Sequence, residues 1–178
     1  MSDAALHERL KSIRLIVLDV DGVLTDGSIT YAEDKTDIKS FHVQDGFGIT
    51  LARQAGLQLG VLTGRSASAV HRRVDELKFD FYAHGHFYKQ EALREMIAAA
   101  EVERHEVLYM GDDVLDLVCL PQVGVFVAPA NAQARAKEHA HWVTERCGGN
   151  AAVREMINAV LRAQGTLRAA EDFFLGAN

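Results

Sequence analysis

The chain has 178 residues, of which 48% are hydrophobic and 25% are charged, and its formal net charge is −6. This length and composition favour one folded domain over residues 1–178 with a sizeable core. The acidic balance argues against nucleic acid or an anionic membrane surface as the main partner. The polar N-terminal sequence and the lack of a long apolar run predict a cytoplasmic protein without a membrane span.

A helix is expected over residues 2–11, followed by a strand over residues 14–20 whose apolar run suits burial on both faces. Strands of this kind lie at the centre of parallel sheets, where catalytic groups gather at the carboxyl ends. The run leads directly into Asp19 and Asp21, which are followed by Gly22. Two carboxylates so close together repel each other, so we expect a divalent cation and a phosphoryl group at this point.

The pattern changes over residues 28–43, where apolar and polar residues alternate on either side of a turn-like Glu33-Asp34-Lys35. This alternation predicts a β-hairpin. The hairpin interrupts the order of strands and helices, and it is too short to form a separate cap domain. The helix that follows is expected to be capped by Asp45 and to end at Gly56.

Strands and helices alternate through most of the remaining sequence. Strands are predicted at residues 57–62, 79–83, 107–110, 123–128 and 142–144. Helices are predicted to begin at Ser66, Lys89 and Asn131, and a last one covers residues 151–164. Pro121 is expected to end a short helix soon after residue 120. This order predicts an α/β fold, a doubly wound parallel sheet with helices on both faces.

The tail, residues 165–178, carries an aromatic pair, Phe173-Phe174, that is unusual near a chain end. Exposed aromatic side chains generally pack against a partner surface. Docking on a neighbouring subunit and packing on the chain's own surface are two interpretations of this pair, and the sequence supports them equally.

Polar residues lie at the carboxyl ends of four predicted strands, and these ends converge on one crevice in a doubly wound sheet. They are Asp19 with Asp21, Thr63, Lys89, and Asp112 with Asp113. A carboxylate can accept a phosphoryl group as an aspartyl phosphate, which divides one displacement into two easier steps. We expect Asp19 to be this nucleophile. We expect Asp21 to protonate the leaving group and then to activate water.

The same strand ends can bind Mg²⁺, which prefers oxygen ligands. Asp19 and Asp112 are the candidate carboxylate ligands, and a backbone carbonyl oxygen is the further ligand from the protein. Asp21 is counted with them as a metal-binding residue. Such a cation would neutralise the acidic cluster and bind a phosphate oxygen.

Four further side chains are expected to support the reaction. Thr63 can donate a hydrogen bond to a phosphate oxygen, and Lys89 can compensate the charge that develops on the phosphoryl group. Asp113 is expected to orient Lys89 or a metal-bound water. Asp116 is a weaker candidate, because its place in a predicted helix is typical of a solvated position.

The residues at the four strand ends, taken in order, resemble the four motifs of the haloacid dehalogenase (HAD) superfamily of phosphohydrolases. Longer stretches are similar to the 3-deoxy-D-manno-octulosonate 8-phosphate phosphatase family. They are DGVLTDGSITY at 21–31, FHVQDGFGI at 41–49, VLTGR at 61–65 and GGNAAVRE at 148–155. The resemblance covers nearly the whole chain, with Ala151 standing where the family usually has another glycine.

This resemblance implies a HAD-like Rossmannoid fold without a cap domain, and a homotetramer whose hairpins form a central barrel. It also implies a magnesium-dependent phosphomonoesterase that acts on 3-deoxy-D-manno-octulosonate 8-phosphate, a small sugar-acid phosphate, in lipopolysaccharide precursor synthesis. By the same resemblance, Arg65, Gly64, Asp45 and Gly46 contact the substrate. The tail is then expected to reach a neighbouring active site.

Three alternatives stay open at this point. A nine-carbon sugar-acid 9-phosphate, or a broader range of sugar phosphates, would suit the same chemistry. A phospho-acceptor signalling domain also places acids, a threonine and a lysine around magnesium, but Asp21 beside Asp19 should make the phosphoenzyme short-lived. A non-catalytic assembly module would use the hairpin and the tail for binding and would release no phosphate.

Overall fold

The structure of the protein, a computed structural model, describes residues 3–33, 37–86 and 88–176. In this part of the chain a large parallel sheet is formed by β1 (Leu15–Leu18), β4 (Gln58–Leu62), β5 (Phe81–Ala83), β6 (Val107–Met110), β7 (Val125–Ala128) and β8 (Trp142–Val143). The strand order is β5-β4-β1-β6-β7-β8, with β1 inside the sheet. The predicted doubly wound α/β fold is confirmed, and no cap domain is present among the described residues.

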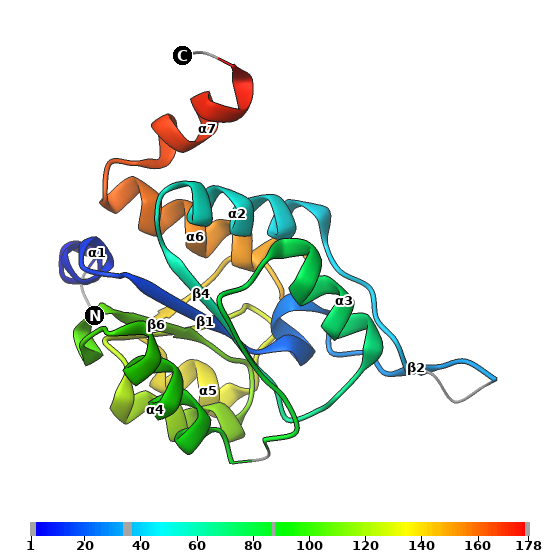
Figure 1. Ribbon diagram of the computed structural model, residues 1–178. Coiled ribbons are helices and arrows are strands. Elements are labelled where there is room, and N and C mark those ends of the chain that lie inside the picture. Colours follow the sequence, from blue (N-terminus) through cyan, green and yellow to red (C-terminus); the bar gives the residue numbers. More distant parts are fainter. Residues whose placement is uncertain (1–2, 34–36, 87, 177–178) are drawn as a thin grey trace.

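Helices cover both faces of this sheet (Figure 1). The α-helices are α1 (Asp3–Lys11), α2 (Val43–Gln54), α3 (Ser68–Leu77), α4 (Lys89–Ala100), α5 (Ala134–His139), α6 (Ala152–Ala163) and α7 (Leu167–Leu175). Three further helical segments are η1 (Val20–Leu24, π-helical), η2 (Arg104–Glu106, 3₁₀) and η3 (Val114–Gln122, 3₁₀).

The central strand β1 is buried on both faces, as its apolar run predicts. Ile16 and Leu18 join the core formed with α1, α2, α3 and α6. Leu15 and Val17 point the other way and join the core formed with α4 and η3. All four are fully buried, and burying each such side chain contributes about 1.5–3 kcal/mol. This double burial holds the carboxyl end of β1, where Asp19 follows, in a fixed place.

The predicted hairpin is present but shorter than its sequence pattern suggests. Strands β2 (Thr30–Tyr31) and β3 (Asp37–Ile38) pair antiparallel, and the hairpin projects from the body of the molecule (Figure 1). Most of the predicted turn Glu33-Asp34-Lys35 lies outside the described residues. Val43, which continues the alternation in sequence, is instead the first residue of α2.

Helices α2, α3 and α5 do not begin at the predicted caps Asp45, Ser66 and Asn131. Their N-cap positions are held by His42, Ala67 and Gln133. The side chain of Asn131 has a distant partner instead, because its carboxamide oxygen accepts a hydrogen bond of 2.8 Å from the backbone N–H of Gly148. Side-chain acceptors bond whichever donor the tertiary fold brings near, so a local capping pattern is misleading here.

Two predictions of helix ends agree with the structure. Helix α2 ends before Gly56, whose φ of 86° is in the left-handed region that favours glycine. The 3₁₀ helix η3 ends at Gln122, soon after residue 120 as predicted, although Pro121 lies inside it. Because η3 is a 3₁₀ helix, the hydrogen-bond ring that proline disturbs in an α-helix is absent at this position.

The tail forms α7, in which the Phe174 ring packs edge-on against Phe47 of α2 at a centroid distance of 5.4 Å. One of the two interpretations of the aromatic pair, packing on the chain's own surface, therefore describes Phe174. Phe173 and Phe174 nevertheless stay 47% and 43% exposed. Among the described helices, none is both long enough and apolar enough to cross a membrane.

Candidate active site

The acidic loop after β1 is shaped by its glycine. Asp19 is 7% exposed, and its Oδ1 accepts a hydrogen bond of 2.7 Å from the N–H of Val20. Gly22 has a φ of 82°, and a Cβ on it would lie 2.1 Å from Oδ2 of Asp112. A side chain at position 22 would therefore be strained and would clash with Asp112. Glycine at this position lets the loop approach the end of β6 closely.

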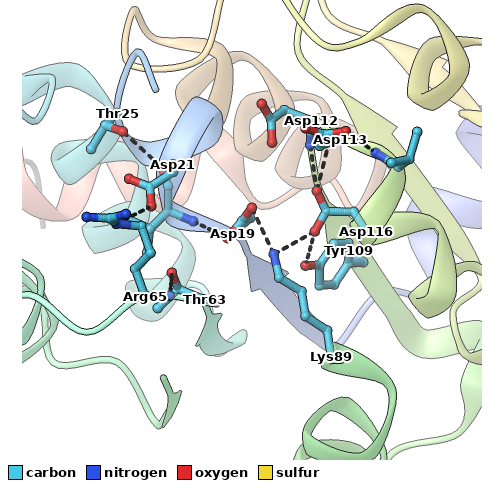
Figure 2. Close-up of polar contacts among 12 residues, drawn as sticks. Asp19, Asp21, Thr25, Thr63, Arg65, Lys89, Tyr109, Asp112, Asp113 and Asp116 are labelled. Atoms are coloured by element: carbon cyan, nitrogen blue, oxygen red, sulfur yellow. Dashed lines mark hydrogen bonds and ion pairs between the residues drawn. The ribbon is translucent and has the colours of Figure 1, made fainter. Parts of the chain in front are cut away.

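Lys89 joins two acids at the bottom of the site (Figure 2). It is the first residue of α4, and its ammonium group is 2.8 Å from Oδ2 of Asp19 and 2.7 Å from Oδ1 of Asp116. The hydroxyl of Tyr109 donates a hydrogen bond of 2.7 Å to the same oxygen of Asp116. Lys89 and Asp116 are 4% and 1% exposed, so these charges compensate each other away from water.

Asp116 is far more central than its sequence position suggested, and the predicted solvated position is wrong. Its Oδ2 accepts hydrogen bonds from the backbone N–H groups of Asp112 and Asp113, at 3.0 and 3.1 Å. The tight turn η3 brings Asp116 back over the loop from which η3 starts. Asp113 was expected to orient Lys89 or a metal-bound water. It caps η3 through the N–H of Val114, and Asp116 orients Lys89 instead, while the role toward a metal-bound water stays a prediction.

Thr63, Gly64 and Arg65 follow the end of β4 and form another side of the site. Thr63 is 2% exposed, and its N–H donates to the carbonyl of Ala83, which extends the sheet pairing. The Thr63 hydroxyl accepts a 3.3 Å hydrogen bond from the N–H of Arg65. The Arg65 side chain extends toward Asp21, and its Nε is 4.0 Å from Oδ2 of that carboxylate (Figure 2).

Lys39, which the sequence analysis missed, forms an ion pair with Asp21. Its ammonium group contacts Oδ1 of Asp21, and its side chain is 1% exposed. It follows β3 in a polar stretch, and nothing in that local pattern distinguishes it from a surface lysine. Only the tertiary fold shows that the end of the hairpin returns to the acidic loop.

Asp45 and Gly46 are not among the described residues that line the cavity, and their predicted contact with the substrate stays a prediction. The buried carboxylate of Asp45 accepts hydrogen bonds from the N–H groups of Ala151 and Arg154, at 3.2 and 2.8 Å, where α6 begins. Burial raises the pKa of Asp45, although these hydrogen bonds oppose the shift. Gly46 lies against Arg73. The motif at Asp45 thus joins α2 to α6.

The remaining predicted residues meet in one cavity of about 480 Å³. The described residues that line it are Asp19, Asp21, Gly27, Thr63, Gly64, Arg65, Lys89, Asp112, Asp113, Leu115 and Asp116. Five of these are acids and two are bases. If all five acids are ionised and Lys39 is added to the bases, two negative charges remain uncompensated among the described groups.

Crowding of acids changes the protonation of this cavity. Burial, followed by repulsion from Asp116, raises the pKa of Asp19 to about 7, and Lys89 opposes that shift. Burial, with repulsion from Asp116 and Asp113, raises the pKa of Asp112 to about 7. Burial alone would lower the pKa of Lys89, but Asp19 and Asp116 outweigh it and raise that pKa. A bound cation would reverse the shifts of the acids.

The donor set fits a divalent metal ion. Asp19, Asp112 and Asp116 each offer a carboxylate oxygen, and these oxygens lie within 4.8 Å of one another. Oxygen donors suit Mg²⁺, and one divalent ion would balance the two remaining charges. Asp116 already binds Lys89 and backbone N–H groups, so Asp19 and Asp112 are the better ligands. Within the described chain, the carboxylate of Asp21 is outside this group and pairs with Lys39, so the predicted metal-binding role of Asp21 stays a prediction.

Comparisons with known proteins agree with this geometry. A profile described as haloacid dehalogenase-like hydrolase matches residues 83–156. The chain is 36% identical over 160 residues to the 3-deoxy-D-manno-octulosonate 8-phosphate phosphatase KdsC of Haemophilus influenzae, covering 90% of this chain and 89% of that protein.

Solved structures show the same relationship. The 3-deoxy-D-manno-octulosonate 8-phosphate phosphatase of Moraxella catarrhalis, in complex with magnesium, phosphate and KDO, superposes with a TM-score of 0.93 at 34% identity, covering 97% of this chain and 99% of that one. The cobalt-bound Haemophilus influenzae phosphatase has a TM-score of 0.87 at 36% identity, with coverages of 89% and 93%. The chain therefore belongs to the 3-deoxy-D-manno-octulosonate 8-phosphate phosphatase family of the haloacid dehalogenase superfamily, and it is a phosphatase.

Proposed function

We propose that this phosphatase hydrolyses 3-deoxy-D-manno-octulosonate 8-phosphate to the free sugar acid and inorganic phosphate, with Mg²⁺ as its cofactor. The observation that carries the proposal is the cavity in which Asp19, Thr63, Lys89 and Asp112 meet beside a second acid, Asp21. The similarity to relatives named for this substrate supports the choice of sugar acid. We further propose that residues 1–178 act as one domain.

In the first step, a carboxylate oxygen of Asp19 attacks phosphorus, and the bond from phosphorus to the sugar oxygen breaks. The carboxyl group of Asp21 gives its proton to that leaving oxygen. In the second step, Asp21 removes a proton from water, and the water oxygen attacks phosphorus. The bond to Asp19 then breaks, which releases inorganic phosphate and restores both carboxyl groups to their starting states.

Charge on the phosphoryl group is compensated by fixed donors in this mechanism. Lys89 contributes its ammonium group, which Asp116 and Tyr109 hold in place, and Thr63 contributes its hydroxyl. Mg²⁺, held by the carboxylates of Asp19 and Asp112 and by the backbone carbonyl of Asp21, would supply further positive charge at the phosphate oxygens. These donors need little rearrangement, because tertiary contacts already fix Lys89.

Arg65 and Gly64 are the proposed contacts of the sugar acid. The Arg65 side chain is 42% exposed at the cavity wall, where a guanidinium group can bind a substrate carboxylate through two hydrogen bonds. Gly64, next to Arg65, has no side chain, which leaves room for the sugar. A sugar acid is therefore a better match to this wall than a neutral hexose phosphate.

We also propose that the protein is a cytoplasmic homotetramer that acts in lipopolysaccharide precursor synthesis. The projecting hairpin supports assembly, because Ile29, Tyr31 and Ile38 expose apolar side chains on it. Apolar groups that gather on a projecting element commonly mark a contact between subunits. Sedimentation of the purified protein tests this part of the proposal, and a monomer at micromolar concentration would contradict it.

Phosphate release from a panel of sugar phosphates, with and without Mg²⁺, tests the reaction. We expect activity to require the metal and to favour the eight-carbon acid over a nine-carbon sugar-acid 9-phosphate and over simple hexose phosphates. Equal activity on hexose phosphates would indicate a broader phosphatase. A long-lived phosphoprotein without phosphate release would instead indicate a signalling domain.

A further inference from the structure

The proposed acid and base, Asp21, is held by a side chain that does not line the cavity. Lys39 contacts Oδ1 of Asp21 with its ammonium group, and its side chain is 1% exposed. The side chain of Asp21 itself is 26% exposed. A buried ammonium group with a carboxylate partner is a specific arrangement, because burying a charge without a partner is very unfavourable.

Asp21 needs such a partner in order to keep its direction. It follows Asp19 by two residues, and three further carboxylates line the same cavity among the described residues. Repulsion from these acids favours rotation of a partly exposed Asp21 side chain toward water. A cation fixed on Oδ1 of Asp21 opposes that rotation.

Arg65 is a weaker restraint than Lys39 at the same carboxylate. Its Nε lies 4.0 Å from Oδ2 of Asp21, and its side chain is 42% exposed. When Arg65 binds a substrate carboxylate, as proposed above, its charge is shared with that group. The Lys39 side chain is buried and is not among the described residues that line the cavity, so a substrate there would leave its contact with Asp21 in place.

We infer that Lys39 is a positioning residue that fixes the carboxylate of Asp21 for proton transfer; this inference rests on the proposed function of Asp21. Lys39 lies one residue after β3, so the same contact joins the hairpin to the catalytic loop. The placement of the hairpin strand and the direction of Asp21 are thereby linked through one side chain.

The variant Lys39→Met, which keeps the length of the side chain and removes its charge, tests the inference. Because a small misplacement of a reacting group is costly, we expect kcat to fall about 10- to 100-fold while KM stays within about twofold. Magnesium-dependent binding of beryllium fluoride should persist, since Asp19, Thr63 and Lys89 are untouched. Lys39→Arg should recover part of kcat, and Lys11→Met, at an exposed pair with Glu8, is the matched control.

A double-mutant cycle shows whether Lys39 acts through Asp21. In an Asp21→Asn background, Lys39→Met should lower the residual rate by less than about twofold. Equal losses in both backgrounds, a change confined to KM, or loss of beryllium fluoride binding would overturn the inference.

A crystal structure of Lys39→Met gives a test that needs no activity. We expect the Asp21 carboxylate to rotate out of the cavity, and an unmoved carboxylate would overturn the inference. If the unmodified protein releases phosphate from none of the sugar phosphates, the proposed function fails, and the structural comparison still decides the role of Lys39.

Discussion

The neighbours of Asp19 act in opposite directions on the pKa of its carboxyl group, and its chemical role differs from its effect on stability. Burial and Asp116 raise its pKa to about 7, whereas Lys89 stabilises its ionised form. The ionised carboxylate is thus costly to the folded chain, although the proposed mechanism requires it as the nucleophile. Asp19→Asn keeps the shape of the side chain and removes both its charge and its nucleophilicity.

We therefore expect Asp19→Asn to lower kcat at least about 10³-fold, because no other group replaces a covalent nucleophile. Its thermal midpoint without metal should match or exceed that of the unmodified protein, since a repelled buried carboxylate is removed. Phosphate release and a thermal scan measure the two effects. Retained turnover would contradict the covalent mechanism, and a large loss of midpoint would show that Asp19 stabilises the fold.

Asp116 differs from Asp19, because it stabilises the folded site and is not proposed to touch the substrate. Asp116→Asn keeps one acceptor oxygen but places an amide group toward donors, either Lys89 and Tyr109 or the two backbone N–H groups. We expect a loss of about 1.5–3 kcal/mol in the free energy of unfolding, typical of a lost hydrogen bond to a charged group. Turnover should fall about 100-fold as Lys89 loses its direction.

Urea denaturation and phosphate release measure these two losses. Asp113→Asn is the matched control, since asparagine is also a good N-cap, and we expect it to change stability by less than about 0.5 kcal/mol. If the two variants behaved alike, the central place of Asp116 in the network would be wrong.

The difference between Asp113 and Asp116 shows which part of the site the sequence could predict. Residues that directly follow a strand, such as Asp19 and Thr63, are placed by the sheet, so their convergence followed from strand order alone. Asp116 and Lys39 reach the site through the turn η3 and through the end of the hairpin. Their partners are set by tertiary packing, and the periodicity of the sequence contains no signal for them.

At the scale of elements, the turn before α6 supports the acidic loop through backbone contacts. The N–H of Gly149 donates a hydrogen bond of 2.9 Å to the carbonyl of Val23. A Cβ on Gly148 would lie 1.7 Å from the carbonyl oxygen of Gly22. Ala151, two residues after Gly149, has a φ of 69°, a conformation that favours glycine, which accounts for the glycine that the family usually has there.

Gly148→Ala should therefore displace the acidic loop, because a clash between the new Cβ and the backbone of Gly22 is not relieved by a change of rotamer. We expect a loss of about 1–3 kcal/mol in the free energy of unfolding, and a fall in kcat of about 10-fold or more. Gly165→Ala is the control, since Gly165 has a φ of 71° but open space around its Cα. It should lose about 1 kcal/mol from backbone strain and keep its kcat. Equal kcat values for the two variants would contradict the proposed support.

At the scale of the whole molecule, the sheet could be predicted because its strands are apolar runs and its connections are short. The same reasoning placed helix starts poorly, as Asp45 shows. Its side chain bonds the start of α6, more than 100 residues away in sequence. Local propensity competes with tertiary contacts at helix ends, whereas burial on both faces leaves a central strand such as β1 few alternatives.

The raised pKa values of Asp19 and Asp112 make the stability of the whole fold depend on pH and on metal. Their ordinary value in an unfolded chain is about 4, and in the folded chain it is about 7. A carboxyl group with a raised folded pKa favours folding while it is protonated. Its contribution is therefore complete below about pH 4 and is lost as the pH rises through about 7. Mg²⁺ requires the ionised carboxylates, so its affinity should increase over the same range.

We accordingly expect the rise in thermal midpoint caused by saturating Mg²⁺ to be larger at about pH 8 than at about pH 6. Without metal, the contribution of these two acids should lower the midpoint over the same interval. Asp112→Asn is the control, because it removes one titrating ligand and should reduce both the effect of magnesium and its dependence on pH. An equal magnesium effect at both pH values would show that Asp19 and Asp112 do not bind the ion as proposed.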